Sequence, residues 1–152
     1  QPTRPWVIAS VKSVAPSPFV NLCNCFMKTA HDLVAAAKSR VQEISISDAD
    51  AAILAADVLV DVREADEYAA GHLAGAVHIS RGMLEFKFSA NPALQSRDLS
   101  ILLYCKTSGR AALAAAALHD MGYLNVRSIS GGFDAWAASG RPVAKPETPS
   151  FE

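Results

Sequence analysis

The chain has 152 residues, 51% of them hydrophobic, so it is long enough to bury one core and is expected to form one domain. Its 14 basic and 15 acidic residues are interspersed, which argues against a basic surface for nucleic acid or an anionic membrane. Apolar runs such as residues 111–118 are far shorter than the roughly 20 residues of a membrane-spanning helix, so we expect neither nucleic acid nor membrane as a partner.

The sequence holds three cysteines, an odd number, in a chain that can build its own core. This count does not suggest a disulfide framework and favours a reducing compartment, so we expect a cytoplasmic protein. No basic stretch followed by an apolar segment marks a signal peptide. Because the sequence begins with Gln1 rather than Met, export before processing stays open.

The N-terminal part differs in composition from the rest, since residues 1–26 hold four of the eight prolines. We interpret residues 1–26 as an appendage, native or added, residues 27–145 as a single domain, and residues 146–152 as a C-terminal tail. Met27 fits a natural start site and an internal methionine equally. Cys23 and Cys25 form a Cys-x-Cys pair in the appendage; we favour an incidental pair over a resolving role toward another cysteine.

From Met27 onward, short apolar runs alternate with helical stretches. Thr29 followed by Asp32 predicts the capping box of a first helix, and Ser47 followed by Asp50 predicts the start of a second. Further helices are expected over residues 110–122 and 131–139, and strands over residues 43–47, 58–62, 76–80, 101–104 and 125–129. Strands that are apolar on both faces belong to a covered parallel sheet. We therefore expect an α/β fold with a mainly parallel sheet of about five strands, flanked by helices on both faces.

Cys105 directly follows the strand predicted at residues 101–104 and stands before the helix that begins near Arg110. In open α/β sheets, ligands bind where the carboxyl ends of strands lead into helices. The loop between them consists of Lys106, Thr107, Ser108 and Gly109. Such residues let successive N–H groups turn toward one centre and bind an anion, and the charges of Lys106 and Arg110 add to this effect. The setting favours a thiolate, so we predict that Cys105 is a nucleophile rather than a buried apolar residue.

Three stretches together resemble the rhodanese family of sulfurtransferases. VLVDVREADEYAAGHLAGAVHI resembles its first signature, with Asp-x-Arg at a strand end and then Glu-Tyr, Gly-His and Gly-Ala. MGYLNVRSISGGFDAWAASGRP resembles its closing signature, in which a Gly-Gly pair precedes a helix with tryptophan. With the Cys105 loop, these stretches cover about residues 45–142, which corresponds to one whole single-domain rhodanese.

The resemblance implies an enzyme of the thiosulfate:cyanide sulfurtransferase type without a cofactor or a metal. The Cys105 thiolate would attack the outer sulfur of thiosulfate, release sulfite and hold a persulfide, which cyanide or a small-molecule or protein thiol would then accept. Lys106 and Arg110 would attract the anionic donor, and the amides of residues 106–110 would hold the persulfide. Many family loops have glycine three residues after the cysteine, where this sequence has Ser108.

Other polar residues lie near the predicted strand ends. Asp61 and Arg63 end one strand; Arg63 could steer anions, but we favour an internal ion pair that shapes the loop. Arg81 is expected either to add positive charge at the mouth of the site or to be an ordinary surface arginine. His72 and His78 have no third ligand at a suitable spacing, so we expect no metal site and interpret His72 as a brace for a turn.

Three alternative functions stay open at this point. Phosphatases and arsenate reductases of the same fold also use Cys followed by Arg, but their loops hold one residue more than the four between Cys105 and Arg110. A regulatory rhodanese module commonly lacks the cysteine, which is present here. A sulfur-relay protein would pass its sulfur to another protein's thiol. The loop length therefore favours a sulfurtransferase over a phosphatase.

Overall fold

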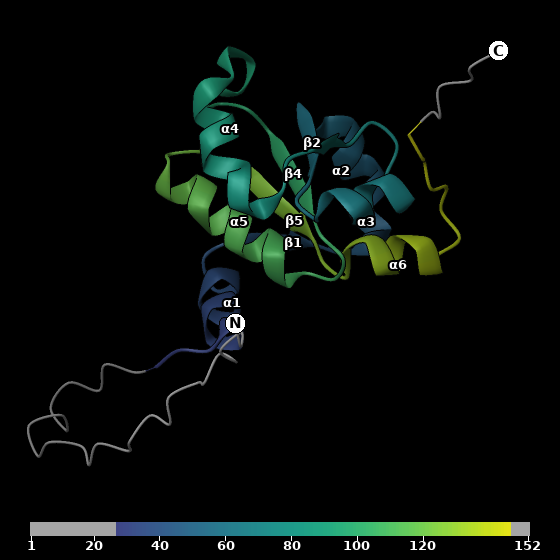
Figure 1. The fold of residues 1–152 in the computed structure, drawn as a ribbon, viewed down its shortest axis with the longest axis horizontal. Coiled ribbons are helices and arrows are strands. Elements are labelled where there is room, and N and C mark those ends of the chain that lie inside the picture. The colour runs from purple at the N-terminus through teal and green to yellow at the C-terminus, as the bar shows by residue number, and fades with distance from the viewer. Residues whose placement is uncertain (1–26, 147–152) are drawn as a thin grey trace, which may run out of the picture.

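The computed structural model describes residues 27–146; the predicted appendage, with Cys23 and Cys25, and residues 147–152 lie outside the described residues. Five strands form one sheet in the order β1-β5-β4-β2-β3, and all neighbouring pairs are parallel. The strands are β1 (Gln42–Ile44), β2 (Val58–Asp61), β3 (Val77–His78), β4 (Ile101–Tyr104) and β5 (Val126–Ile129). The predicted five-stranded parallel α/β fold is confirmed, with β4 in the middle of the sheet (Figure 1).

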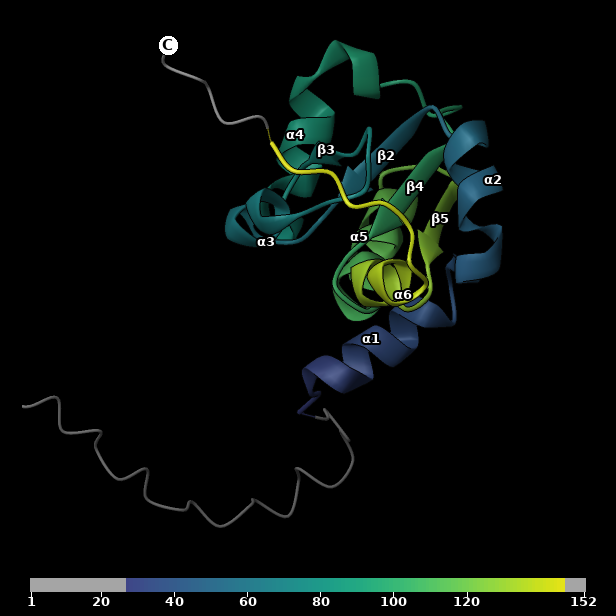
Figure 2. The same cartoon turned by 90° about the vertical axis from the view of Figure 1, so that its right-hand side faces the viewer.

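Helices cover both faces of this sheet (Figures 1 and 2). The helices are α1 (Ala30–Lys38), α2 (Ala49–Ala55), α3 (Ala65–Ala70), α4 (Leu84–Ala90), α5 (Gly109–Asp120) and α6 (Gly132–Ala138). Apolar strand residues such as Val60 and Leu103 pack on one face with α4 and α5, whereas Leu59 and Leu102 pack on the other face with α2 and α6. Short 3-10 turns span Ile46–Asp48, Arg81–Met83 and Pro92–Leu94. Burial on both faces explains why the strands lack a polar side.

Of the two helix starts predicted from capping residues, one is confirmed and the other is wrong. The predicted capping box of α1 is confirmed, since Asp32 N–H donates to Thr29 Oγ1 and Thr29 N–H donates to the Asp32 carboxylate. The predicted cap at Ser47 is wrong, because Ser47 lies inside the 3-10 turn that precedes α2. Its hydroxyl bonds to the hydroxyl of Ser45 at 2.7 Å and caps no helix.

Helix α1 lies beside α5, the helix that follows the predicted nucleophile (Figure 2). Ala37 of α1 packs on Ala112 and Ala116 of α5. Small side chains let two helix backbones approach closely, so α1 reaches the first turn of α5, where Val34 contacts the position of Gly109. The start of α5 is therefore enclosed by α1 as well as by the sheet.

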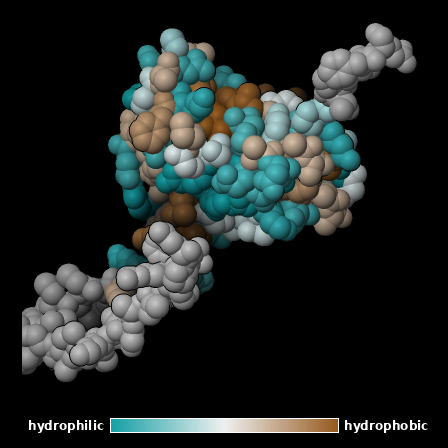
Figure 3. All heavy atoms as spheres, in the orientation of Figure 1, coloured by the Kyte–Doolittle hydropathy of each residue, from teal (hydrophilic) through white to brown (hydrophobic). Residues whose placement is uncertain are grey.

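Hydrophilic residues cover most of the face of the domain shown in Figure 3. Within residues 27–146, no helix has both the length and the apolar character needed to cross a membrane.

Candidate active site

Cys105 directly follows β4, the central strand, at the carboxyl edge of the sheet, and three residues separate it from α5. It is the free cysteine of the described part of the chain. Its side chain is only 1% exposed and contacts the apolar core between the sheet and α5. The residue therefore lies at the edge where the sequence predicts a ligand site, but its side chain is buried rather than on the surface.

The start of α6 holds the carbonyl groups of the loop after Cys105. The N–H of Phe133 donates to the carbonyl oxygen of Cys105 at 2.8 Å, and the N–H of Asp134 donates to that of Lys106 at 3.0 Å. These two bonds fix the carbonyl groups of the loop toward α6. The peptide planes at the start of the loop are thus oriented by a helix that is about 27 residues further along the chain.

Gly132 makes this contact possible. Its φ is +55°, a left-handed conformation that favours glycine. A Cβ atom at this position would stand 2.7 Å from the carbonyl oxygen of Thr107 and closer still to that of Cys105. Any larger residue would therefore displace the loop or α6.

The N–H groups of the same loop are open. Within residues 27–146, none of the backbone N–H groups of residues 106–110 donates to a protein acceptor; the first such bond at the start of α5 runs from Ala112 N–H to the Ser108 carbonyl at 3.0 Å. Ser108 is the N-cap of α5, but its hydroxyl makes no capping bond. A row of open N–H groups at the start of a 12-residue helix is suited to hold an anion beside Cys105.

The two basic side chains of the loop are both paired with carboxylates. Arg110 donates from Nη1 and Nη2 to the two oxygens of Glu67 on α3, at 2.7 and 3.0 Å. These hydrogen bonds lower the pKa of Glu67 from 4.5 to about 2, and the same contact raises the pKa of Arg110. Lys106 Nζ contacts the Asp134 carboxylate at 2.8 Å. The cationic loop that the sequence predicts is therefore balanced by two acidic neighbours.

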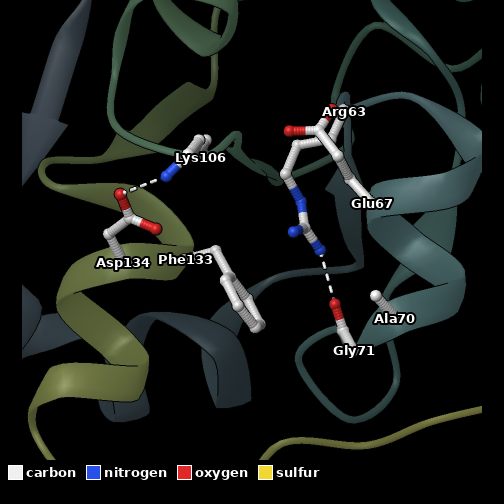
Figure 4. Close-up of a pocket in the computed structure, with 7 residues that line it drawn as sticks. All are labelled: Arg63, Glu67, Ala70, Gly71, Lys106, Phe133 and Asp134. Atoms are coloured by element: carbon white, nitrogen blue, oxygen red, sulfur yellow. Dashed lines mark hydrogen bonds and ion pairs between the residues drawn. The ribbon is translucent and has the colours of Figure 1, made fainter.

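A pocket of about 230 Å³ opens beside the loop. Its wall is formed by Arg63, Glu67, Ala70, Gly71, Lys106, Phe133 and Asp134. In Figure 4, the Arg63 side chain lies between Phe133 and Gly71, and the Lys106–Asp134 pair stands on the side of α6. The pocket thus combines charged groups of both signs with one aromatic wall.

A buried ion pair between Asp61 and Arg63 lies under this pocket. Arg63 Nη2 donates to Asp61 at 2.7 Å and to the Gly71 carbonyl at 2.7 Å. The Tyr104 hydroxyl donates to Asp61 at 2.8 Å and accepts the N–H of Leu73 at 3.1 Å. Burial raises the pKa of Tyr104, which keeps the hydroxyl protonated as a donor. Asp61 and Arg63 together hold the segment after α3 in place. This is the internal ion pair that the sequence favours for these two residues.

Arg81 and the two histidines are not among the residues that line this pocket. Arg81 contacts Glu85 at 2.6 Å, one helical turn further on. His78 Nε2 bonds to the Arg63 carbonyl at 2.7 Å. His72 stacks on Tyr68 with ring centroids 3.8 Å apart. Each of the three therefore has a local partner, and the role of Arg81 toward the donor stays a prediction.

Sequence reasoning named the loop but missed the residues that surround it. Glu67, Gly132 and Asp134 stand inside the quoted signatures, yet no spacing argument assigns them to the Cys105 loop. Tyr104 carried a usable signal, because a hydroxyl at the end of a buried strand needs a hydrogen-bond partner. Pairing across elements, as between Arg110 and Glu67, depends on the topology and leaves no local pattern.

Comparison with known proteins places these features in a family. The rhodanese-like domain family matches residues 45–139. A chloroplastic thiosulfate sulfurtransferase 16 of Arabidopsis thaliana is 32% identical over 119 residues, covering 71% of this chain and 98% of that protein. The thiosulfate sulfurtransferase GlpE of Pseudomonas entomophila is 38% identical over 82 residues, covering 54% of this chain and 72% of the relative.

A solved structure from Rhodopseudomonas palustris, described as a protein of unknown function and possible tyrosine phosphatase, matches with a TM-score of 0.72. It is 34% identical, and the match covers 78% of this chain and 96% of that one. The α/β fold, the loop after the central strand and the matched residues 45–139 lead to one assignment. The chain belongs to the rhodanese-like sulfurtransferase family.

Proposed function

We propose that this chain transfers sulfane sulfur from thiosulfate or a related donor to a thiol or cyanide through a persulfide on Cys105. The observation that carries the proposal is the set of open N–H groups of residues 106–110, which directly follow a free cysteine at the end of the central strand. The names of the Arabidopsis and Pseudomonas relatives support thiosulfate as a donor. The burial of Cys105 suits an intermediate that must be kept from water.

The proposed reaction has two steps. In the first, the Cys105 thiolate attacks the outer sulfur of thiosulfate; an Sγ–S bond forms, the S–S bond of the donor breaks, and sulfite leaves with the electron pair. In the second, cyanide or a thiolate attacks the outer sulfur of the persulfide and Cys105 leaves as a thiolate. No net oxidation or proton source is required. The open N–H groups would stabilise the anion in both steps because they have no acceptor in the protein to give up.

Charge has a smaller role in this proposal than the sequence suggests. Lys106 and Arg110 each have a carboxylate partner, so the donor would meet their dipoles and partial charge rather than two free cations. The backbone therefore contributes the main attraction to the anion. Lys106 and Arg110 tune the approach of the donor, and Asp61 with Arg63 keeps the pocket in shape.

A tyrosine phosphatase is the competing proposal, because the Rhodopseudomonas palustris protein carries that description. Four residues separate Cys105 from Arg110, and the same-fold phosphatases use a loop one residue longer. The shorter loop encloses one sulfur atom and leaves little room for the oxygens of a phosphoryl group. A sulfur relay to a protein thiol is the same chemistry with a different acceptor, and it follows the same first step.

The test compares the whole chain with Cys105→Ser in two assays. We expect the wild type to form thiocyanate from thiosulfate and cyanide, with negligible hydrolysis of aryl phosphates. The serine variant keeps the volume but not the accessible anion, so it should lose thiocyanate formation while its thermal melt stays within a few degrees. Aryl-phosphate hydrolysis that equals sulfur transfer, and disappears in the serine variant, would replace the proposal with the phosphatase.

A further inference from the structure

A lysine from outside the family match reaches the loop around Cys105. Lys38 is the last residue of α1, and α1 precedes residues 45–139, which the family matches. Its Nζ atom donates to the hydroxyl of Ser108 at 2.7 Å. The two residues are 70 positions apart in the sequence, so only the packing of α1 beside α5 brings them together.

Glu43 is the acidic neighbour of this lysine. Its Oε1 atom is buried and has no hydrogen-bond partner among the described residues, while Lys38 Nζ stands 3.5 Å away. Glu43 lies on β1 in register with Ser128 of β5, so it is anchored by the sheet. A buried carboxylate oxygen needs a nearby positive charge, which makes this place favourable for the ammonium group. Lys38 is thus held between the sheet and the loop.

The contact explains an unusual feature of Ser108. A serine at an N-cap normally accepts a hydrogen bond from the N–H two or three residues further on. Here the hydroxyl makes no capping bond and accepts from Lys38 instead. A capping hydroxyl would accept a hydrogen bond from the N–H of Arg110 or Ala111. Both groups are at the start of α5, where the row of open donors lies.

We infer that Lys38 is a positioning residue that holds the Ser108 hydroxyl away from the first turn of α5 and so keeps its N–H groups open for the anionic donor and the persulfide. A loop with glycine at this position has no hydroxyl that could close on the amides. The lysine is needed because this chain has serine there. The inference rests on the proposed function, since the ligand of the amides is the donor.

The test measures one substitution in two backgrounds. In the wild type, Lys38→Met should raise the KM for thiosulfate about fivefold with little change in kcat, because the donor must then displace the Ser108 hydroxyl from one ordinary hydrogen bond to an amide. In a Ser108→Gly background, the same substitution should change KM by less than about twofold, because no hydroxyl remains to close on the amides. Lys38→Arg keeps a donor and should stay close to the wild type. All variants are compared in about 1 M potassium chloride, where the screening length falls to about 3 Å and distant charge has little effect.

A second readout does not depend on turnover. Titration with sulfate, an unreactive dianion, is followed by the amide signals of residues 106–110 in ¹H–¹⁵N spectra. The dissociation constant for sulfate should rise about fivefold in Lys38→Met and recover when Ser108→Gly is added, following the same loss of about one hydrogen bond. An equal effect of Lys38→Met in both backgrounds would overturn the inference and leave Lys38 as a source of charge. If sulfate binding follows the expected pattern in a chain that turns over no thiosulfate, the proposed function fails and the positioning role stands.

Discussion

The guanidinium of Arg110 and the carboxylate of Glu67 form two parallel hydrogen bonds, at 2.7 and 3.0 Å. The pair joins the first turn of α5 to α3, and its carboxylate partner Glu67 also lines the pocket beside the loop. A two-pronged contact of this kind fixes direction as well as charge. It turns the arginine of the loop toward α3 and partly neutralises it, so the electrostatics of the site depend on a residue that stands 43 positions away.

The first prediction concerns this pair. Glu67→Gln removes the negative charge and leaves Arg110 with a weaker partner, so the KM for thiosulfate should fall about two- to threefold at low salt. Arg110→Ala should raise it, because one cation is lost. Initial rates at low and high salt measure both effects, which should shrink as salt is added. A KM that rises in Glu67→Gln would show that the carboxylate is needed to orient Arg110.

The second prediction concerns the dependence of stability on pH. The pKa of Glu67 falls from 4.5 to about 2 in the folded chain, mainly through the hydrogen bonds from Arg110. The unfolded chain therefore takes up the proton first as pH falls, so the pair stabilises the fold fully above pH about 4.5 and loses this contribution toward pH about 2. The side chains are 34% and 27% exposed, so solvent screening keeps the effect small.

Thermal melts of the wild type and Glu67→Gln check this expectation. The Tm of the variant should lie below that of the wild type near neutral pH, and the difference should narrow as pH falls from about 4.5 toward 2, because the Glu67 carboxylate is present only in the wild type. A difference that widens with acid would contradict the lowered pKa.

A third prediction tests the contact between α6 and the loop. Gly132→Ala and Gly140→Ala both place a Cβ at a positive φ, +55° and +77°, and each costs about 1–2 kcal/mol for that reason. Only Gly132 meets the loop carbonyls, whereas the space around Gly140 is open. We expect Gly132→Ala to be less stable than Gly140→Ala by more than about 1 kcal/mol and to lose most sulfur transfer. Equal denaturation midpoints would show that the close approach does not shape the loop.

Much of this architecture could be predicted from the sequence because it is encoded locally. The alternation of apolar runs and helices gave five parallel strands, and the Thr29–Asp32 spacing gave the start of α1. A strand at the edge of the sheet is shorter than the sequence predicts. β3 has two of the five residues expected at 76–80, since it has a neighbouring strand on one side only. Ser47 failed as a cap because the chain forms a 3-10 turn over Ile46–Asp48 before α2 begins.

The candidate site also has a part that the sequence predicts and a part that it does not. Cys105 and its loop could be found because a strand, a short polar loop and a helix follow one another in the chain. The partners of the loop could not, since Glu67, Asp134 and Lys38 arrive from three separate elements. Charge counted along the sequence therefore overstated the positive potential of the loop, because opposite charges are brought in by the fold.

A fourth prediction concerns the buried network under the pocket. Tyr104→Phe leaves Asp61 without one donor and the Leu73 N–H without its acceptor, which should cost about 1–3 kcal/mol. Tyr123→Phe is the matched control, since this hydroxyl also donates one hydrogen bond and accepts one: it donates to the partly buried Leu94 carbonyl and accepts from Arg97. Both variants should melt earlier, and only Tyr104→Phe should also change the kinetics of sulfur transfer. If the two variants have identical kinetics, then Asp61, Arg63 and Tyr104 contribute to the stability of the fold and not to sulfur transfer.

Mass spectrometry of the intact chain after treatment with thiosulfate tests the persulfide most directly. The chain should gain the mass of one sulfur atom, and peptide mapping should locate it on Cys105; addition of cyanide should remove it and release thiocyanate. Cys105→Ser, treated in the same way, should gain nothing. A wild type that gains no sulfur on Cys105 while it still forms thiocyanate, or that gains it on another cysteine, would contradict Cys105 as the residue that carries the sulfur.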